Sequence, residues 1–302
     1  MAMKRLLPAL CAAVLAALLL LYTDTAAAAV RDGIDLCLTA VIPALFPFFA
    51  ASSLLISLGA AEAAGRVLRR PFGRLFRCGG AGSAALLLGL VGGYPVGARS
   101  AAALVRQGAL TPAEGERLLT FCNNAGPAFA VGVAGSAVFG SAHIGAQLYL
   151  IHVSAALLTG LLLCRRPMSV SAAQTAGNAR RGFAQSFLRA VEDAVSAMAR
   201  VCGFVVFFLV LLRLTEQLTG SLPPAAAGFC ELTNGILRLM PDRRGFVTAA
   251  ALLGWGGLSV HCQTAAVTAG SGISLRRYLP AKALQAALSA VLAALCAPRL
   301  LP

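Results

Sequence analysis

Apolar runs of about 20 residues, separated by short polar loops, follow one another along most of the chain. They lie near residues 6–22, 35–58, 118–140, 144–163, 195–214 and 278–296. A helix rises about 1.5 Å per residue, so each run is long enough to cross the roughly 30 Å hydrocarbon core of a bilayer. Because lipid offers the backbone no hydrogen-bond partner, these runs are expected to be helices. The pattern predicts an all-α, polytopic integral membrane protein.

Two further apolar segments are broken by glycine near their middles. Residues 83–106 contain Gly92–Pro95, residues 245–270 contain Gly256–Gly257, and the glycine pairs match at one constant offset. The first segment is predicted to be a re-entrant helical hairpin entered from the cytoplasm, with a single kinked crossing as the alternative. The second is predicted to be a matching hairpin entered from outside. Interrupted segments in corresponding places of two halves indicate a transporter-type site.

The arginines between the runs indicate the topology. Five of them lie within residues 66–77, and Arg165 and Arg166 follow the run that ends at residue 163. Positive charge is retained in the cytoplasm, so both loops and the N-terminus are predicted to be cytoplasmic. Counting the crossings gives the two halves opposite orientations and predicts two inverted repeats, each with a re-entrant hairpin. The arginines at 238, 243, 244, 276 and 277 argue against this orientation of the second half.

These patterns divide the chain into four parts. Lys4 and Arg5 precede the first run as in a signal peptide, but the run is long and further spans follow, which favours an uncleaved anchor. The predicted parts are an N-terminal transmembrane anchor (1–30), a first hairpin-bearing repeat (31–164), a cytoplasmic linker with an amphipathic helix (165–190) and a second repeat (191–302).

The composition excludes a soluble domain. Of the 302 residues, 59% are hydrophobic and 12% charged, with a mean hydropathy of +0.81, so the lipid bilayer is the first expected partner. The net charge of +14 comes from arginines between the spans, which fits cytoplasmic retention and not nucleic-acid binding. The nine cysteines contain no C-x-x-C pair, and no enzyme signature occurs, so we expect no metal, no cofactor and no enzyme.

Few polar groups lie at membrane depth, and they gather at the breaks. Broken helix ends expose backbone N–H and C=O groups, which with amide side chains can bind a small polar solute through both donors and acceptors. Glu231 is either a proton or cation site or a helix cap. Ser259 and His261 as a hydrolase pair would lie on different sides of a helix. The candidate substrate-binding residues are Gly92, Gly93, Tyr94, Pro95, Asn123, Asn124, Pro127, Glu231, Thr233, Asn234, Ser259, His261 and Gln263.

Five of these motifs together resemble those of a known family. They are residues 92–98, 110–118, 123–127, 231–235 and 256–261, and the chain resembles the YlbJ family of sporulation integral membrane proteins, within the nucleoside-recognition or Gate group. The resemblance implies a spore-forming bacterium, a plasma-membrane location, a role in spore cortex formation and kinship with the hairpins of concentrative nucleoside transporters. The acidic ligand-binding motifs of those transporters are missing here.

Three functions follow from these observations. The first is a transporter-like carrier of a small polar solute, nucleoside-like or other. The second is a non-transporting scaffold that recruits spore-envelope machinery through residues 165–190. The third, an intramembrane hydrolase, requires Ser259 as its nucleophile. The sequence leaves the solute, the coupling ion and the oligomeric state open.

Overall fold

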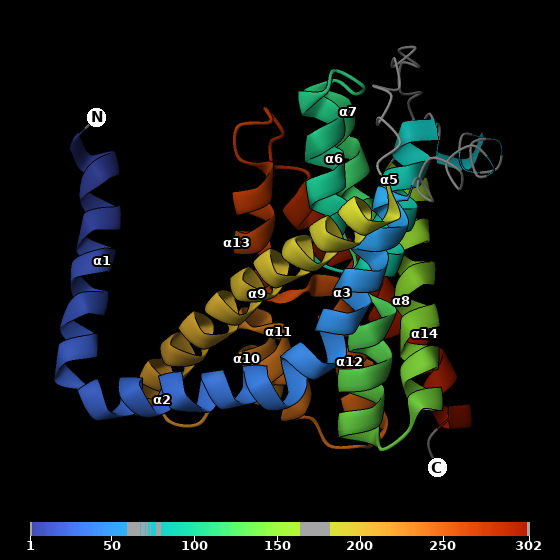
Figure 1. Cartoon of the computed structure of the whole chain (residues 1–302). Helices are drawn as coiled ribbons and strands as arrows, with labels where there is room; N and C mark the ends of the chain where they lie inside the picture. Colours follow the sequence, from blue (N-terminus) through green and yellow to red (C-terminus); the bar gives the residue numbers. More distant parts are fainter. Residues whose placement is uncertain are drawn as a thin grey trace.

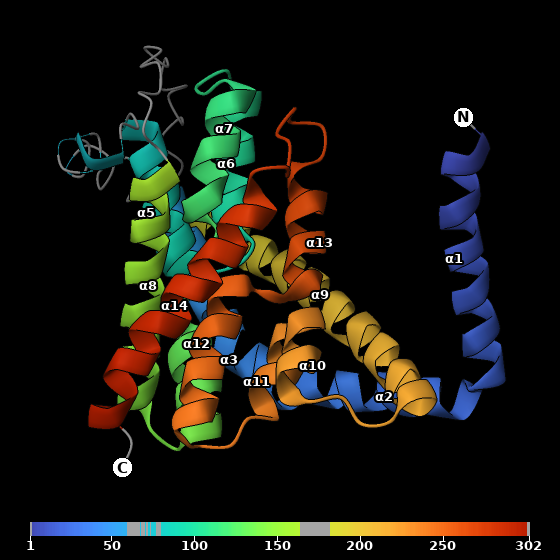
Figure 2. The ribbon, with the colours of Figure 1, turned by 180° about the vertical axis from the view of Figure 1, so that it is seen from behind.

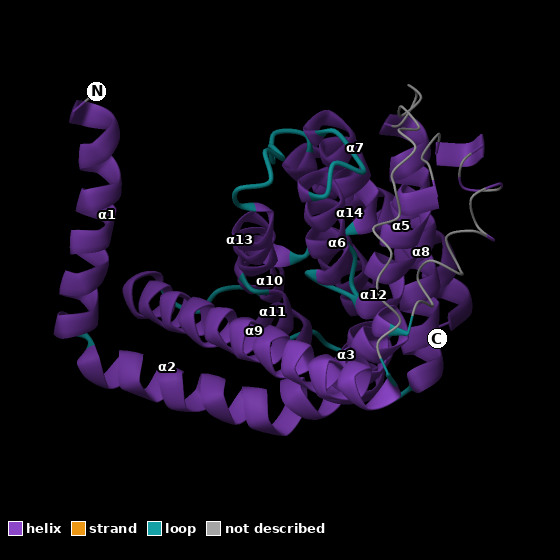
Figure 3. Ribbon diagram, turned by 45° about the horizontal axis from the view of Figure 1, so that its top comes forward, coloured by secondary structure: helices purple, strands orange, loops and turns teal. Residues whose placement is uncertain are grey.

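The computed structural model describes residues 2–58, 80–163 and 182–300, together with positions 67, 70, 72 and 74–76. Within these ranges every regular element is a helix, joined by short loops (Figure 3). Half of the arginine-rich loop at 66–77 and residues 165–181 of the predicted linker lie outside the described part. The all-α class predicted from the hydropathy pattern is confirmed.

The N-terminal region forms an L-shaped arm. Helix α1 (Ala2–Leu21) is followed by α2 (Thr23–Leu36), and the axes of the two segments are bent by 94°. The hydroxyl of Thr23 donates to Leu19 O and Leu20 O at the corner. Figures 1 and 2 show α1 standing apart from the other helices, while α2 runs along one end of the molecule and packs against α9. Near the corner, Leu15, Leu18 and Leu19 of α1 also pack against the apolar cluster that includes Leu209, Val210 and Leu214 of α9.

The first half continues through a π-helical segment, η1 (Cys37–Val41), into α3 (Ile42–Ser57). Helices α5 (Gly80–Gly92) and α6 (Val96–Arg106) follow, and then α7 (Pro112–Cys122). Helix α7 begins at a capping box, in which Thr111 and Glu114 bind each other's backbone. A second π-helical segment, η2 (Ala128–Val138), and α8 (Ala142–Leu163) complete this half.

Helices α5 and α6 form the predicted first hairpin. They pack side by side, and a Cβ atom at Gly89 would lie 3.0 Å from the Cα of Gly97 and would collide with the carbonyl of Cys122. At about 1.5 Å per residue, neither helix reaches across a bilayer alone. Glycine at both positions lets the hairpin and α7 approach to backbone contact.

The second half begins with one long helix, α9 (Phe183–Thr219), of 37 residues. The C-terminal end of the linker predicted at 165–190 and the span predicted at 195–214 are both parts of it. Two short helices follow, α10 (Pro224–Cys230) and α11 (Leu232–Leu237). Helices α12 (Arg243–Trp255), α13 (Gly257–Thr268) and α14 (Tyr278–Leu300) end the described chain.

The second hairpin lies elsewhere than the sequence predicted. Helices α12 and α13 join at Gly256, whose φ of 91° is left-handed, and continue as one 26-residue span, Arg243–Thr268, so the hairpin predicted at 245–270 is wrong. Helices α10 and α11 instead pack side by side, with Gly228 against Gly235 and Glu231 at their turn. Figures 1 and 2 show the α10–α11 and α5–α6 hairpins opening toward opposite ends of the bundle. The inverted repeat stays a prediction.

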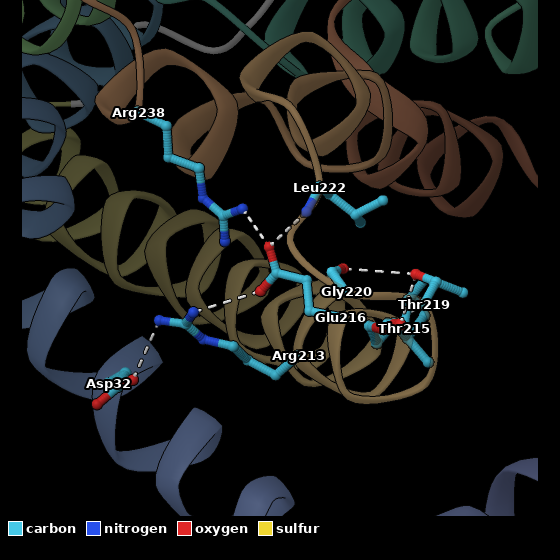
Figure 4. Close-up of polar contacts among 9 residues, drawn as sticks. Asp32, Arg213, Thr215, Glu216, Thr219, Gly220, Leu222 and Arg238 are labelled. Carbon is cyan, nitrogen blue, oxygen red and sulfur yellow. Dashed lines mark hydrogen bonds and ion pairs between the residues drawn. The ribbon is translucent and has the colours of Figure 1, made fainter.

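Glu216 connects three elements near the base of the second hairpin (Figure 4). Its carboxylate accepts from Arg238 at 2.6 Å and from the backbone N–H of Leu222 at 3.4 Å. Arg213 lies 3.3 Å from the same carboxylate and 3.5 Å from Asp32 in α2. Arg238, which argued against the predicted orientation, therefore has an acidic partner within the protein.

The described helices fit a membrane protein that crosses the bilayer several times. Four of them are long and apolar enough to span it: Ala142–Leu163, Phe183–Thr219, Arg243–Thr268 and Tyr278–Pro298. The bent pair Leu6–Leu21 and Thr23–Val41 adds a fifth span if it is counted as one. The integral, multi-pass character predicted from hydropathy is thus confirmed.

Candidate functional site

One cavity of about 60 Å³ lies where four helix interruptions meet. Hairpin α5–α6 contributes its turn at Gly93, and the α7–η2 break contributes Gly126. Hairpin α10–α11 contributes its turn at Glu231, and the first turns of α13 contribute Ser259 and Gln263. Helix ends carry backbone groups without intrahelical partners, so this cavity concentrates hydrogen-bonding capacity that the spans otherwise lack.

The two hairpin tips reach the cavity in the same way. A Cβ atom at Gly93 would lie 2.9 Å from Gly126 N, so the first tip touches the break of the helix that follows it. A Cβ atom at Gly257 would lie 3.0 Å from Leu232 N, so the second tip likewise touches the start of α13. In each half, glycine allows a hairpin tip to lie directly against a broken helix.

Glu231 is the charged side chain of the cavity wall, and it is 2% exposed. Its carboxylate accepts from both Asn234 N and Asn234 Nδ2 at 2.7 Å, which caps α11. The capping role considered from the sequence is therefore present, and the same residue also faces the cavity. The proton or cation site considered for Glu231 stays a prediction.

The remaining wall is mixed in polarity. Ser259 and Gln263 are buried on the same face of α13, and Gln263 Nε2 donates to Ser259 Oγ at 3.4 Å. Thr233 adds a hydroxyl from the second hairpin, and α3 and η2 add aromatic rings, including Phe49 and Phe129. Apolar walls with a few convergent polar groups are characteristic of small-molecule sites.

Tyr94 joins the two halves beside the cavity. Its ring lines the cavity, and its hydroxyl donates to Leu253 O in α12 at 3.0 Å. The adjoining peptide bond, Tyr94–Pro95, is cis.

Asn123 and Asn124 lie behind the cavity in a buried polar network. Asn123 Nδ2 donates to Thr264 Oγ1 at 2.9 Å and to Tyr278 OH at 3.1 Å, while Asn123 Oδ1 accepts from Ala98 N at 3.3 Å. These bonds join the α7–η2 break to the first turn of α6 and to α13 and α14. Both asparagines are fully buried, and neither is among the residues that line the cavity, so their bonds serve to hold the break in place.

Sequence reasoning missed the residue at the centre of this network. Lys282, in α14, is fully buried, and its Nζ donates to Asn123 O at 3.1 Å and to Gln285 Oε1 at 2.7 Å. The same Nζ lies 5.2 Å from the centroid of the Tyr94 ring. A signal existed in the sequence: residues 278, 282, 285 and 289 share one helix face, and all four are polar or bear a hydroxyl.

The predicted site residues therefore fall into two groups and a remainder. The polar network also includes His261, whose Nδ1 lies 3.4 Å from Tyr278 OH. Among the described residues no hydrogen bond joins Ser259 to His261. Of the predicted residues, Gly92, Gly93, Tyr94, Glu231, Thr233, Ser259 and Gln263 line the cavity, Asn123, Asn124 and His261 lie in the network, and Pro95, Pro127 and Asn234 flank the breaks.

Fold and site together define a polytopic α-helical membrane protein built around helical hairpins. Residues 38–164 match the model of the Gate family, described as nucleoside recognition. The chain is 28% identical over 307 residues to the sporulation integral membrane protein YlbJ of Bacillus subtilis (strain 168). The aligned region covers 86% of this chain and 75% of the relative. No solved structure matches the chain. The resemblance noted from the sequence motifs is thereby confirmed: residues 38–164 match the Gate family model, and the chain is similar to this sporulation protein over most of its length.

Proposed function

We propose that the protein is a transporter-like carrier that binds a small polar solute in the cavity between the two hairpin tips. One observation carries the proposal: four helix interruptions, from both halves of the chain, converge on one cavity. Broken helices at a shared central site are the arrangement by which secondary transporters bind their substrates. A purely structural bundle has no need of four interruptions at one depth, because each leaves backbone groups to be satisfied.

The cavity walls favour an uncharged or weakly basic polar solute. Glu231 accepts, Ser259 and Thr233 both donate and accept, and Gln263 does both through its amide. An engineered cavity of about 150 Å³ holds a benzene molecule, whereas this cavity measures about 60 Å³. A nucleoside-sized solute therefore requires the hairpin tips to separate from the conformation described.

The proposed setting is the plasma membrane of a spore-forming bacterium, with the N-terminus in the cytoplasm. This part rests on the name of the relative from Bacillus subtilis and on the positive charge of the first-half loops. A requirement for the carrier during spore cortex formation is the expected physiological role.

The test is uptake by purified protein reconstituted in proteoliposomes. A defined mixture of ribonucleosides, monosaccharides and amino acids is added, and the vesicle contents are measured by mass spectrometry. We expect at least one solute to accumulate with the wild type and its uptake to fall by about tenfold or more in Glu231→Gln, since a charged hydrogen-bond acceptor is lost.

Glu192→Gln is the matched control because Glu192 is exposed on α9. It should transport like the wild type. Equal uptake by Glu231→Gln and Glu192→Gln would show that Glu231 does not bind the solute. If the wild type accumulates no solute, the carrier function is contradicted.

A further inference from the structure

Lys282 places a basic nitrogen in the interior of the bundle without an acidic partner. It is fully buried, and none of the ion pairs among the described residues includes it. A buried ammonium without compensation costs several kcal/mol. The groups around its Nζ must therefore offset the free-energy cost of burying the ammonium.

The hydrogen-bond network fixes what those groups are. Phe121 O is a carbonyl that can only accept, so the Asn124 group 2.7 Å away must be its Nδ2. Asn124 Oδ1 then accepts from Gln285 Nε2 at 3.0 Å, which turns Gln285 Oε1 toward Lys282 at 2.7 Å. The amide orientations thus follow from a backbone carbonyl, and Lys282 faces an acceptor.

The other neighbours of Nζ also carry negative potential. Asn123 O, at 3.1 Å, lies just beyond the end of α7, where carbonyls have no intrahelical partner. The Tyr94 ring, 5.2 Å away at its centroid, offers the negative face of its π system. Two oxygen acceptors and one aromatic face can receive the three N–H groups of an ammonium.

We infer that the Asn123 carbonyl, the Gln285 amide oxygen and the Tyr94 ring form a cation-binding site, and that the Lys282 ammonium is its permanently tethered occupant. Carbonyl and amide oxygens are the ligand types that bind inorganic cations, and an aromatic face suits an alkylammonium. The tethered cation holds the tip of the first hairpin, the α7–η2 break and α14 at one point.

This site can be tested apart from transport, because its occupancy affects stability. Lys282→Ala retains Cβ and removes a fragment equivalent to n-propylammonium, so that free cation is the matched probe. We expect the Tm of the purified variant in detergent to fall by roughly 5 °C or more. Added n-propylammonium chloride should raise it again in a saturable manner, while 1-propanol, similar in size but uncharged, should not. The wild type, whose site is already occupied, should respond to neither.

Lys282→Met separates charge from volume, because methionine fills the space without a donor. It should be destabilised and should not respond to n-propylammonium. A Tm for Lys282→Met equal to that of the wild type, or a Lys282→Ala response equal for the amine and the alcohol, would overturn the inference.

A double-mutant cycle covers the case in which Lys282→Ala does not reach the membrane. Tyr94→Leu and Lys282→Met are measured singly and together, with Tyr94→Phe as the control that keeps the ring. The inference expects Tyr94→Leu to lower the Tm more in the wild-type background than in the Lys282→Met background. Equal losses in both backgrounds would show that the ring does not bind the ammonium.

Discussion

The Tyr94 hydroxyl donates to the backbone carbonyl of Leu253, 3.0 Å away and 159 residues later in the chain. The bond joins the tip of the first hairpin to the last turns of α12, just before the Gly256 break. A side chain of one half thus satisfies a carbonyl near the interruption of the other half. The two halves are connected at the depth of the cavity.

Removing this hydroxyl should weaken the connection without removing the ring. We expect Tyr94→Phe to lower the free energy of unfolding by about 1 kcal/mol, the net value of a typical hydrogen bond. Thermal unfolding in detergent measures the change. Tyr22→Phe, at the corner of the N-terminal arm and far from the cavity, should leave the transition unchanged. An unchanged free energy of unfolding in Tyr94→Phe would mean that this hydrogen bond does not contribute to stability.

The first hairpin should be intolerant of a methyl group at its glycine contact. A Cβ atom at Gly97 would collide with the carbonyl of Cys122, and such overpacking typically costs about 1–3 kcal/mol. We expect Gly97→Ala to reduce the amount of folded protein recovered from membranes, measured by fluorescence-detected size exclusion.

Gly203→Ala provides the control for that experiment. Gly203 lies within α9, and nothing lies within 4 Å of a Cβ atom built there. Alanine favours helix by about 0.5–1 kcal/mol over glycine, so recovery should be equal to or above that of the wild type. Equal losses in the two variants would contradict the close packing at Gly97.

The cap of α11 should depend on the carboxylate of Glu231. Glu231→Ala leaves Asn234 N without its 2.7 Å acceptor, and loss of a cap costs about 1–2 kcal/mol. Glu231→Gln keeps one carbonyl oxygen and should lose less. Hydrogen exchange of the 224–237 segment, read by mass spectrometry, should rise in the order wild type, Gln variant, Ala variant. Any other order would show that the Glu231 carboxylate does not stabilise the N-terminus of α11.

The Glu216–Arg238 pair should stabilise the base of the second hairpin in a salt-dependent way. The atoms lie 2.6 Å apart and the side chains are 14% and 24% exposed. A double-mutant cycle with Glu216→Gln and Arg238→Gln should give a coupling of about 1 kcal/mol at low salt. It should shrink at 1 M salt, where the Debye length falls to about 3 Å. A coupling free energy near zero at low salt would show that the contact does not contribute to stability.

The sequence predicted what depends on local pattern. Spans follow from hydropathy, the α7 capping box from Thr111 and Glu114, and the first hairpin from the Gly92–Pro95 break. The Gly256–Gly257 pair was misread because a left-handed glycine can interrupt a continuing span as well as turn a hairpin. The second hairpin was overlooked because its helices have only seven and six residues, too few to show a helical period.

The division of the candidate residues between cavity and network depends on tertiary contacts. Asn123 and Glu231 both occur at breaks in apolar context, yet only Glu231 faces the cavity. Asn123 is turned into the network by partners in α13 and α14, which lie more than 100 positions later in the chain. The surroundings of Lys282 likewise include groups from the first half of the chain, Asn123 O and the Tyr94 ring, which pattern within α14 does not predict.

The right-angled corner at Thr23 has a consequence for how the protein sits in lipid. Helix α1 is 20 residues long, about 30 Å at the α-helical rise and equal to the hydrocarbon thickness, while α2 leaves it at 94°. With α1 upright, α2 lies parallel to the membrane plane, in the headgroup region. The arm then fixes the depth of the bundle in the bilayer. A change in bilayer thickness should therefore change the distance from the cavity to the water on each side.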